Sequence, residues 1–288
     1  MQLDSPYLGS GFQWLRGNLH THTTVSDGEK PPEQTIADYE ALGYHFLAIS
    51  DHDSLVDPAD YQSRTAMTLL PADEVSANGS HIGAVGITAV VDPSPNRQKV
   101  LDETAEMGGF TILNHPSWQR QFSHFTNAQM LELTGYAGIE IYNGIVERQH
   151  GAAMATDRWD WLLGQGKRVW GFANDDKHFE IDMERGWNVA QAADRSPAAI
   201  IDALVHGRFY ASTGVQIDSI ELQGRLLRIV APNAQRIRFI GAAGIECRYV
   251  NGAHAEYEIT GEEGCCVRAE CFGAGAAMAW CQPVWITP

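Results

Sequence analysis

The chain has 288 residues, of which 44% are hydrophobic and 19% are charged, which is the composition of an ordinary globular protein and excludes a disordered one. Twenty basic residues against 36 acidic residues give a formal net charge of −16. A surface this acidic repels phosphate backbones, so we expect no stable binding of duplex nucleic acid. No apolar run approaches the roughly 18 residues that a membrane span needs, so we expect no membrane partner.

The opening residues and the cysteines bear on the compartment. The first residues lack a basic segment followed by an apolar one, so we expect no secretory signal. The five cysteines all lie in the last quarter of the chain, and their number is odd: Cys247, Cys265, Cys266, Cys271 and Cys281. We interpret them as reduced thiols in a cytoplasmic protein.

From about residue 14 to residue 178, short apolar runs alternate with helical stretches. The runs are Leu15–His20, His45–Ser50, Thr68–Glu74, Ile82–Val91, Phe110–Asn114, Gly138–Tyr142 and Lys167–Ala173. The helix candidates between them are Pro32–Leu42, Asn96–Met107, Asn127–Leu133 and Arg148–Leu163. This alternation predicts an α/β fold of parallel strands joined by crossovers, either a barrel or a wound sheet. Asn78 and Gly79 lie in a connection too short for a helix, which predicts a hairpin there.

The chain changes character near residues 213–217. Before this point, a last helix is marked by Ser196 as N-cap, Pro197 at its first position and Gly207 past its end. After Gly214, short β-like runs are separated by Gly, Asn or Pro. They predict a small antiparallel, sandwich-like β domain at residues 214–288, following a larger α/β domain at residues 1–213.

Histidines and acids gather where the predicted strands end. His20 and His22 are two residues apart, so on an extended chain both imidazoles point to one side. Of the eleven histidines, six lie near a strand end or the hairpin, at positions 20, 22, 52, 81, 115 and 178. Because the carboxyl ends of strands form the active face of barrels and wound sheets, we expect these side chains to meet. Asp51, beside His52, is expected either to orient an imidazole or to be solvated.

Several separated motifs resemble the PHP (polymerase and histidinol phosphatase) domain family over about residues 14–213. These motifs are Gly17-Asn-Leu-His-Thr-His-Thr, Ser26-Asp-Gly, Ile49-Ser-Asp-His-Asp, Glu74, His81, Asn114-His-Pro, Ile139-Glu-Ile-Tyr-Asn and Asp176-Lys-His. The resemblance implies a distorted (β/α)7 barrel, two or three divalent metal ions and phosphoester hydrolysis.

The resemblance also implies a set of metal ligands. His20, His22, Glu74 and Asp176 resemble the ligands of a first ion. Glu74, His81 and His115 resemble those of a second ion, and Asp27, His52 and His178 those of a third. Asp175 precedes Asp176 and competes for its role, but the spacing from Asp176 to His178 repeats that of the first histidine pair. We assign catalytic roles to Glu74, Asp176 and His178.

The ligand types suit Mn²⁺, Zn²⁺ or Fe²⁺ and do not choose among them. A metal lowers the pKa of bound water from about 15.7 to about 7, so a hydroxide is available to attack phosphorus. We predict that Arg185 binds the phosphate of a small organic or nucleotide substrate, and that Asn143 lines the pocket. Because ligating imidazoles must be neutral, we expect metal loss as the pH falls through about 6.

Two other functions fit the same residues. A metal-bound hydroxide also attacks carbonyl carbon, so a carbamate or aryl-ester hydrolase is the first alternative. An arginine in the pocket favours phosphate, whereas an apolar, aromatic pocket favours the ester. The second alternative is a non-catalytic interaction module. The sequence leaves the substrate, the metal and the oligomeric state open.

Overall fold

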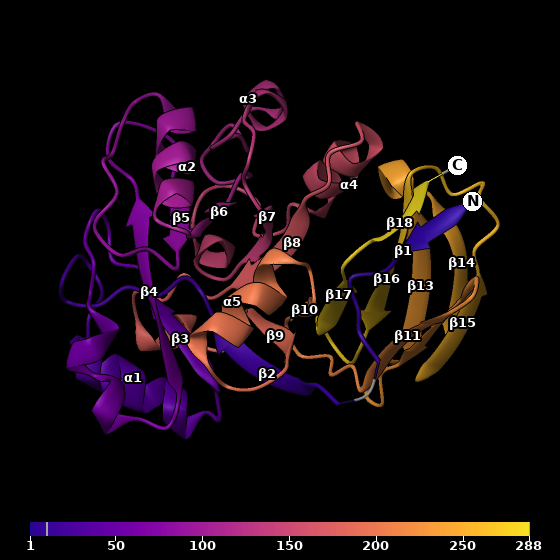
Figure 1. Cartoon of the computed structure of the whole chain (residues 1–288), viewed down its shortest axis with the longest axis horizontal. Coiled ribbons are helices and arrows are strands. Elements are labelled where there is room, and N and C mark those ends of the chain that lie inside the picture. The colour runs from indigo at the N-terminus through magenta and orange to yellow at the C-terminus, as the bar shows by residue number, and fades with distance from the viewer. Residues whose placement is uncertain (10, 288) are drawn as a thin grey trace.

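The computed structural model describes residues 1–9 and 11–287, and the part from β2 to α5 alternates strands and helices (Figure 1). Its strands are β2 (Gln13–Asn18), β3 (Phe46–Ile49), β4 (Thr68–Val75), β5 (Ile82–Val85), β6 (Phe110–Leu113), β7 (Gly138–Asn143), β8 (Trp170–Asn174), β9 (Trp187–Ala192) and β10 (Phe209–Ser212). Its helices are α1 (Pro32–Ala41), α2 (Arg97–Glu106), α3 (Asn127–Glu132), α4 (Thr156–Gly164) and α5 (Pro197–Val205). The fold is therefore mixed α/β, as the sequence predicts.

Local signals placed two of these features correctly. The predicted hairpin is confirmed, since β4 and β5 pair antiparallel with Val75 opposite Ile82. The last predicted helix is confirmed as α5, where the Ser196 hydroxyl accepts a hydrogen bond from the Ala199 amide at 3.2 Å. Gly207 follows the helix with a φ of 72°, a conformation that glycine adopts without strain.

Two expectations about this part were wrong. The helix expected from Arg148 begins at Thr156, because residues 145–148 form only a short 3-10 turn and Gly151 has a non-helical φ of 130°. Strand β9 was missed altogether. All but one of its residues are buried, so it shows no alternation of polar and apolar positions, and its buried Asn188 and Gln191 conceal its apolar character.

The sheet brings the strand ends together. Strands β2, β3 and β4 are parallel, as are β6, β7 and β8, whereas β5 runs antiparallel to β4 and β6. Strand β9, which was not predicted, pairs antiparallel with the other edge of β2, so the sheet holds an antiparallel pairing besides the predicted hairpin. An isolated parallel bridge between Thr21 and Lys177 joins the segments that follow β2 and β8. The carboxyl ends of β2 and β8 therefore lie side by side although the strands are far apart in the sheet.

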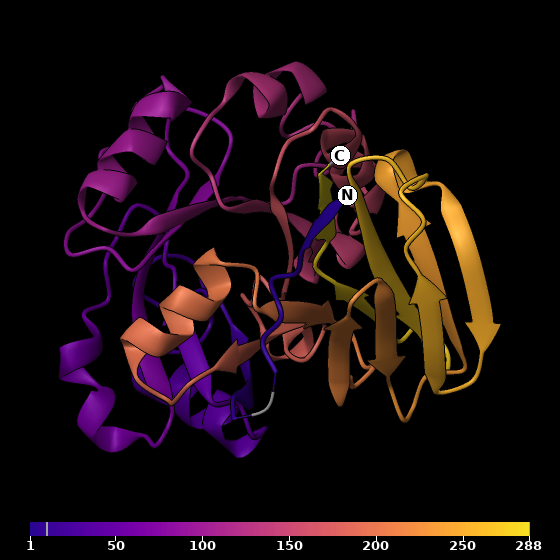
Figure 2. The same cartoon turned by 45° about the vertical axis from the view of Figure 1, so that its right-hand side comes forward.

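The rest of the chain is antiparallel β structure. It comprises β11 (Ser219–Gln223), β12 (Leu226–Val230), β13 (Arg236–Gly241), β14 (Glu246–Asn251), β15 (His254–Glu258), β16 (Cys266–Phe272), β17 (Met278–Cys281) and β18 (Val284–Thr287). Strands β11, β12 and β15 form a separate sheet, and its Ile220 and Leu227 share one hydrophobic core with Phe239 and Val267 of the main sheet. The short strand β1 (Gln2–Asp4) pairs with β18, so the two ends of the chain lie together (Figure 2).

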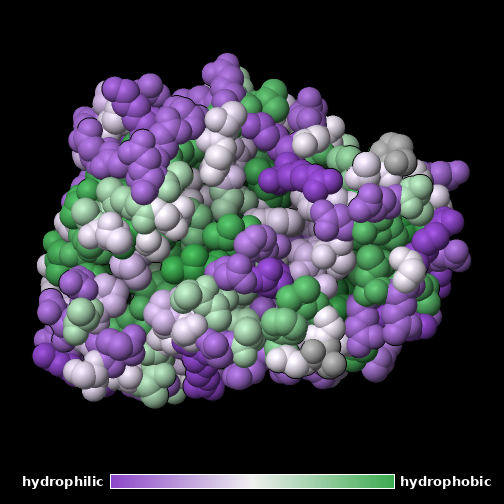
Figure 3. All heavy atoms as spheres, in the orientation of Figure 1, coloured by the Kyte–Doolittle hydropathy of each residue, from purple (hydrophilic) through white to green (hydrophobic). Residues whose placement is uncertain are grey.

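The main sheet continues through the predicted domain boundary, because β10 pairs with β17. The boundary at residues 213–217 stays a prediction. In the described part of the chain, no helix has the length and apolar character needed to cross a membrane. Apolar residues gather around α5 in the middle of one face, and hydrophilic residues cover α2 (Figure 3).

A buried ion network ties α4 to β16. The Arg268 guanidinium is only 1% exposed and contacts Asp160 at 2.6 Å and Glu270 at 2.7 Å. It also lies 4.7 Å from the ring centre of Trp159. Because Glu270 is itself buried, this arginine neutralises a carboxylate that water cannot reach.

We predict that Arg268→Ala destabilises the protein by about 3–5 kcal/mol, because it leaves the Asp160 carboxylate without its ion-pair partner and buried Glu270 with Arg238 alone. The midpoint of urea unfolding measures this effect. Arg228→Ala is the matched control, since Arg228 pairs at 2.7 Å with Glu256 on the surface and its loss costs at most about 1 kcal/mol. Equal midpoints for the two variants would contradict the prediction.

Candidate metal centre

All nine predicted ligand residues meet at the edge of the sheet where the parallel strands have their carboxyl ends, and His81 lies at the amino end of the antiparallel strand β5. Glu74, near the end of β4, lies at the centre and is 1% exposed. Its carboxylate oxygens lie 3.0–3.3 Å from imidazole nitrogens of His20, His22, His52, His81 and His115. A single carboxylate among five imidazoles is the arrangement that a ligand shared between ions needs.

Asp176, rather than Asp175, faces this cluster. An oxygen of Asp176 lies 3.2 Å from Nε2 of His20 and 3.1 Å from Nε2 of His22. The Asp175 carboxylate accepts hydrogen bonds from the Tyr39 hydroxyl at 2.8 Å and from the backbone amides of residues 184–186. Asp175 therefore fixes the loop after β8, and Asp176 is the acid available to a metal.

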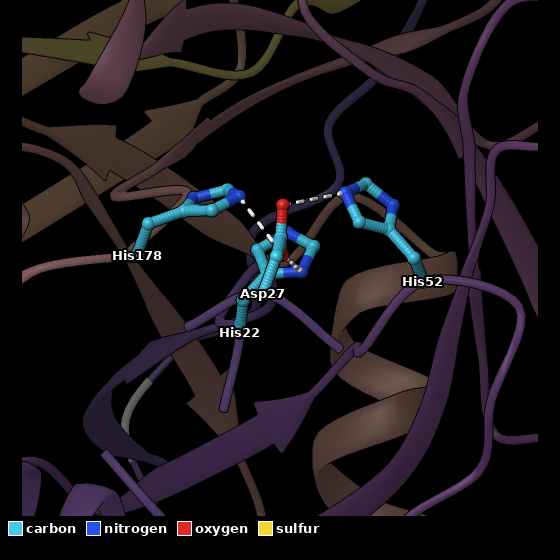
Figure 4. Close-up of side chains that lie close together, drawn as sticks. All are labelled: His22, Asp27, His52 and His178. Atoms are coloured by element: carbon cyan, nitrogen blue, oxygen red, sulfur yellow. Dashed lines mark ion pairs between the residues drawn. The ribbon is translucent and has the colours of Figure 1, made fainter. Parts of the chain in front are cut away.

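A second group is formed by the side chains of His22, Asp27, His52 and His178, which converge (Figure 4). Asp27 lies 3.2 Å from Nε2 of His178 and 3.7 Å from Nε2 of His52, and its side chain is 55% exposed. Nδ1 of His22 lies 3.7 Å from the same carboxylate, so this imidazole separates the outer group from the inner one. These four side chains have ligand atoms close enough to share one ion.

Unpaired polar atoms test whether the residues fit a metal. Nε2 of His20, Nε2 of His22, Nδ1 of His52, Nδ1 of His81 and Oδ1 of Asp176 are buried and make no hydrogen bond. Nδ1 of His20 donates to Glu140 at 2.8 Å, which leaves a lone pair on Nε2 facing the oxygens of Glu74 and Asp176. Lone pairs that converge in this way repel one another unless a cation or a proton lies between them. The residues therefore fit a divalent metal.

The pKa values of the cluster residues show that positive charge is favourable at this site. Burial lowers the pKa of His22, but Asp176 and Glu74 outweigh burial and raise it to about 9. The pKa of His20 is also raised, since Asp176, Glu74 and Glu140 together outweigh its burial. Burial raises the pKa of Glu74, yet the surrounding imidazoles hold it well below its ordinary value. Without metal, protons therefore occupy the positions that cations would take.

Two of the candidate ligands have a strained backbone. His115 has a φ of 31° and Asp176 a φ of 52°, in the left-handed region that residues with a side chain rarely adopt. The backbone amide of His115 donates to Glu140 at 2.7 Å, which holds this conformation in place. Backbone strain of this kind is concentrated at functional sites, which agrees with a site at this position.

Sequence reasoning gave no role to the residue that orients the cluster. Glu140 lies inside β7, is buried, and accepts from Nδ1 of His20, from the His115 amide and from the amide groups of Asn143 and Asn174. Four donors on one carboxylate fix the tautomer of His20 and aim its Nε2 at Glu74. Its sequence signals were an acid within a largely apolar strand and its place in the Ile139-Glu-Ile-Tyr-Asn motif, and neither revealed its role.

We predict that Glu140→Gln weakens metal binding about 10- to 100-fold, the cost of losing an acceptor behind a ligating histidine. The glutamine amide would direct hydrogens at groups that are already donors. Competition with a chelator measures the affinity. Glu132→Gln, an exposed acid on α3, serves as the control, and equal affinities in the two variants would refute the role of Glu140.

Asp51 meets neither expectation placed on it. It is fully buried and accepts from the Thr23 hydroxyl at 2.6 Å and from the amides of Thr23 and Ser26. It therefore braces the loop that carries Asp27 instead of orienting an imidazole or facing solvent. Among the remaining histidines, His124 contacts the cluster: its Nε2 accepts from the His81 amide at 2.7 Å.

The two predicted substrate-binding residues are engaged within the protein. The Asn143 amide is buried and donates to Glu140 at 2.8 Å and to Asp176 at 3.1 Å. Nε of Arg185 donates to the Ile181 carbonyl, and its Nη1 lies 3.8 Å from Glu147. Neither residue lines the cavity at the metal centre. Their roles in substrate binding stay predictions.

Comparison with known proteins bears on the fold of the chain. No family model matches the chain, and no curated protein does. A solved structure described as a two-domain protein containing a predicted PHP-like metal-dependent phosphoesterase, from Bacteroides vulgatus, is 18% identical, covers 96% of each chain and has a TM-score of 0.59. The chain has this PHP-like fold. A candidate metal-dependent phosphoesterase from Bifidobacterium adolescentis is less similar, with 14% identity, coverage of 66% of this chain and 96% of that one, and a TM-score of 0.45.

Proposed function

We propose that the protein is a metal-dependent phosphoesterase acting on a small phosphorylated substrate. The observation that carries the proposal is the cluster itself, with Glu74 within 3.3 Å of five imidazoles and buried nitrogens that lack partners. Two or three divalent ions, of Mn, Zn or Fe type, would outweigh the charge of Asp27, Glu74 and Asp176 and leave a positive centre. Such a centre attracts a phosphate even without an arginine.

The roles of the side chains follow from their contacts. His20, held by Glu140, would ligate through Nε2 together with His22, Glu74 and Asp176. Nδ1 of His178 donates to the Asp176 carbonyl at 3.0 Å, so its Nε2 faces outward beside Asp27. Bound metals would supply an activated water and hold the phosphate oxygens. Glu74, Asp176 and His178 line the cavity in which this water and the phosphate would lie, which is why we assign catalytic roles to them.

We also infer the finer architecture that the resemblance implies. The bridge between Thr21 and Lys177 supports a distorted barrel of seven strands, closed at its carboxyl ends. The core shared by the β11–β12–β15 sheet and the main sheet supports a sandwich-like C-terminal part.

A carboxylic-ester or carbamate hydrolase is a second candidate, and one observation favours it. The cavity at the centre is lined by Trp118, Ile145, Val146 and Gln149 besides the candidate ligands. None of these residues is a cation. An apolar, aromatic mouth suits an uncharged ester as well as it suits a phosphate ester.

Metal analysis coupled to a hydrolysis screen tests the proposal. The screen contains phosphate esters of nucleosides, sugars and aryl alcohols, together with aryl carboxylic esters. Release of inorganic phosphate that chelation abolishes and metal restores supports a phosphoesterase. Hydrolysis of the carboxylic esters alone would replace the proposal with the second candidate. A fully metal-loaded protein that hydrolyses nothing would indicate an interaction module.

A further inference from the structure

The residues that line the cavity restrict which chemical groups of a substrate can lie beside the metal centre. The cavity has a volume of about 140 Å³, and besides the candidate ligands it is lined by Trp118, Ile145, Val146 and Gln149. Trp118 is half-buried there, with its ring centre 5.0 Å from that of His115 and 5.5 Å from that of His81. Because this ring lies beside two candidate ligands, it would contact the part of the substrate that is joined to a metal-bound phosphate.

This wall is built from two segments joined through their backbones. The Gln119 amide donates to the His150 carbonyl at 2.8 Å, and the Ala152 amide donates to the Ser117 carbonyl at 3.0 Å. The first segment carries Trp118, and the 3-10 turn before the second carries Ile145 and Val146. The apolar residues are therefore fixed in position relative to His115, which precedes Trp118 by three residues.

The charges around the cavity exclude a second anionic group. In the part of the chain that the structure describes, no Lys or Arg lines the cavity. The nearby Arg148 donates to the two oxygens of Asp182 at 2.6 and 2.8 Å, and its guanidinium lies 5.1 Å from the Phe179 ring centre. A substrate with another phosphate or carboxylate would meet no free cation beyond the metal ions themselves.

We infer that the substrate carries a single anionic group joined to an uncharged, apolar and preferably planar group, which packs against Trp118. This inference rests on the proposed function. It narrows the substrates to those with one phosphate group and no other anionic group, such as aryl phosphates, and excludes bisphosphates and phosphorylated acids.

Binding of three phosphonates to the metal-loaded protein tests the inference, because their P–C bond resists hydrolysis. Phenylphosphonate, methylphosphonate and 2-carboxyethylphosphonate present the same anionic head with an aromatic, a minimal and a charged tail. By titration calorimetry we expect phenylphosphonate to bind about tenfold more tightly than methylphosphonate, and 2-carboxyethylphosphonate to bind most weakly. Equal or tighter binding of the carboxyethyl compound would overturn the inference.

Substitutions locate the contact. Trp118→Ala is expected to remove the advantage of phenylphosphonate over methylphosphonate, whereas Tyr249→Ala, which removes an exposed ring from β14, is expected to keep it. An advantage that persists in Trp118→Ala, or an equal loss for all three compounds, would overturn the assignment of the Trp118 contact. Gln149→Arg is expected to strengthen binding of the carboxyethyl compound. If none of the three binds while metal content is full, the phosphoesterase proposal itself fails.

Discussion

Replacing Glu74 with glutamine is expected to remove both the bound metal and the hydrolytic activity. The substitution keeps the shape of the side chain but replaces a buried anion shared by five imidazoles with a neutral amide. The amide group of glutamine would direct N–H donors into the space between the imidazole nitrogens where the metal ions would bind. The ions would therefore lose an anionic ligand, and the amide hydrogens would repel them. We expect activity to fall at least about 100-fold, because even an acceptor behind a ligand is worth about 10- to 100-fold.

Metal content and activity must be measured together with a test of folding. The double variant His20→Ala with His22→Ala is expected to abolish turnover as well, without unfolding a core of this size. Glu33→Gln, an exposed acid on α1, is expected to keep both metal and activity. Near-ultraviolet circular dichroism reports whether each variant keeps its packing. A Glu74→Gln protein with full metal content and unchanged activity would contradict the assignment of this residue.

The residues that meet at the centre were visible in the sequence because each lies beside a strand end. His20 and His22 follow β2, His115 follows β6, and Asp176 follows β8. Parallel neighbours align these ends, so position along the chain translates into proximity. Which atoms face one another, and how the candidate ligands divide among ions, depends on rotamers that no spacing encodes.

The supporting residues were not predictable in the same way. Glu140 lies in a strand, and its four donors come from segments that are 3 to 120 residues away in the sequence. The loop after β3 similarly uses Asp51 for Thr23 and Ser26. Long-range hydrogen bonds of this kind leave no periodic pattern, and the missed strand β9 has the same origin, since its Asn188 is buried through hydrogen bonds to β8.

The metal-free and metal-loaded proteins are expected to respond to pH in opposite directions. In the metal-free protein the pKa of His22 is raised to about 9, so its protonated form stabilises the fold. This contribution is fully present below the unfolded-state pKa of about 6.5 and is lost as the pH rises through about 9. For His22 alone it is on the order of 3 kcal/mol, and His20 and His52, whose pKa values are also raised, act in the same direction.

Histidines with a lowered pKa, among them His124, His178 and His45, together with Glu74, reduce the stability of the metal-free protein at acidic pH. Burial lowers the pKa of His178 and lowers that of His124 to about 2, so both are neutral in the fold and cost stability below about pH 6.5. The pKa of Glu74 is held low by imidazoles, and its contribution is lost as the pH falls below about 4. Burial acts in the opposite direction on two carboxyl groups, since it raises the pKa of Asp73 to about 7 and that of Asp175 to about 6. These effects offset one another on the acid side, so the clear expectation for the metal-free protein is a loss of stability above pH 6.5.

Metal binding reverses the dependence above this pH, because a ligating imidazole must release its proton. Urea unfolding of chelator-treated protein is expected to show falling stability from pH 6.5 to pH 8.5, and reloaded protein is expected to show constant or rising stability. Calorimetric titration with metal at pH 7, in buffers of different ionisation enthalpy, should show net release of protons. Because His22 binds its proton so tightly, this competition should begin above the pH of about 6 expected from an ordinary imidazole. Metal-free protein whose stability is flat or rises between pH 6.5 and pH 8.5 would show that the imidazoles around Glu74 are neutral before any metal binds.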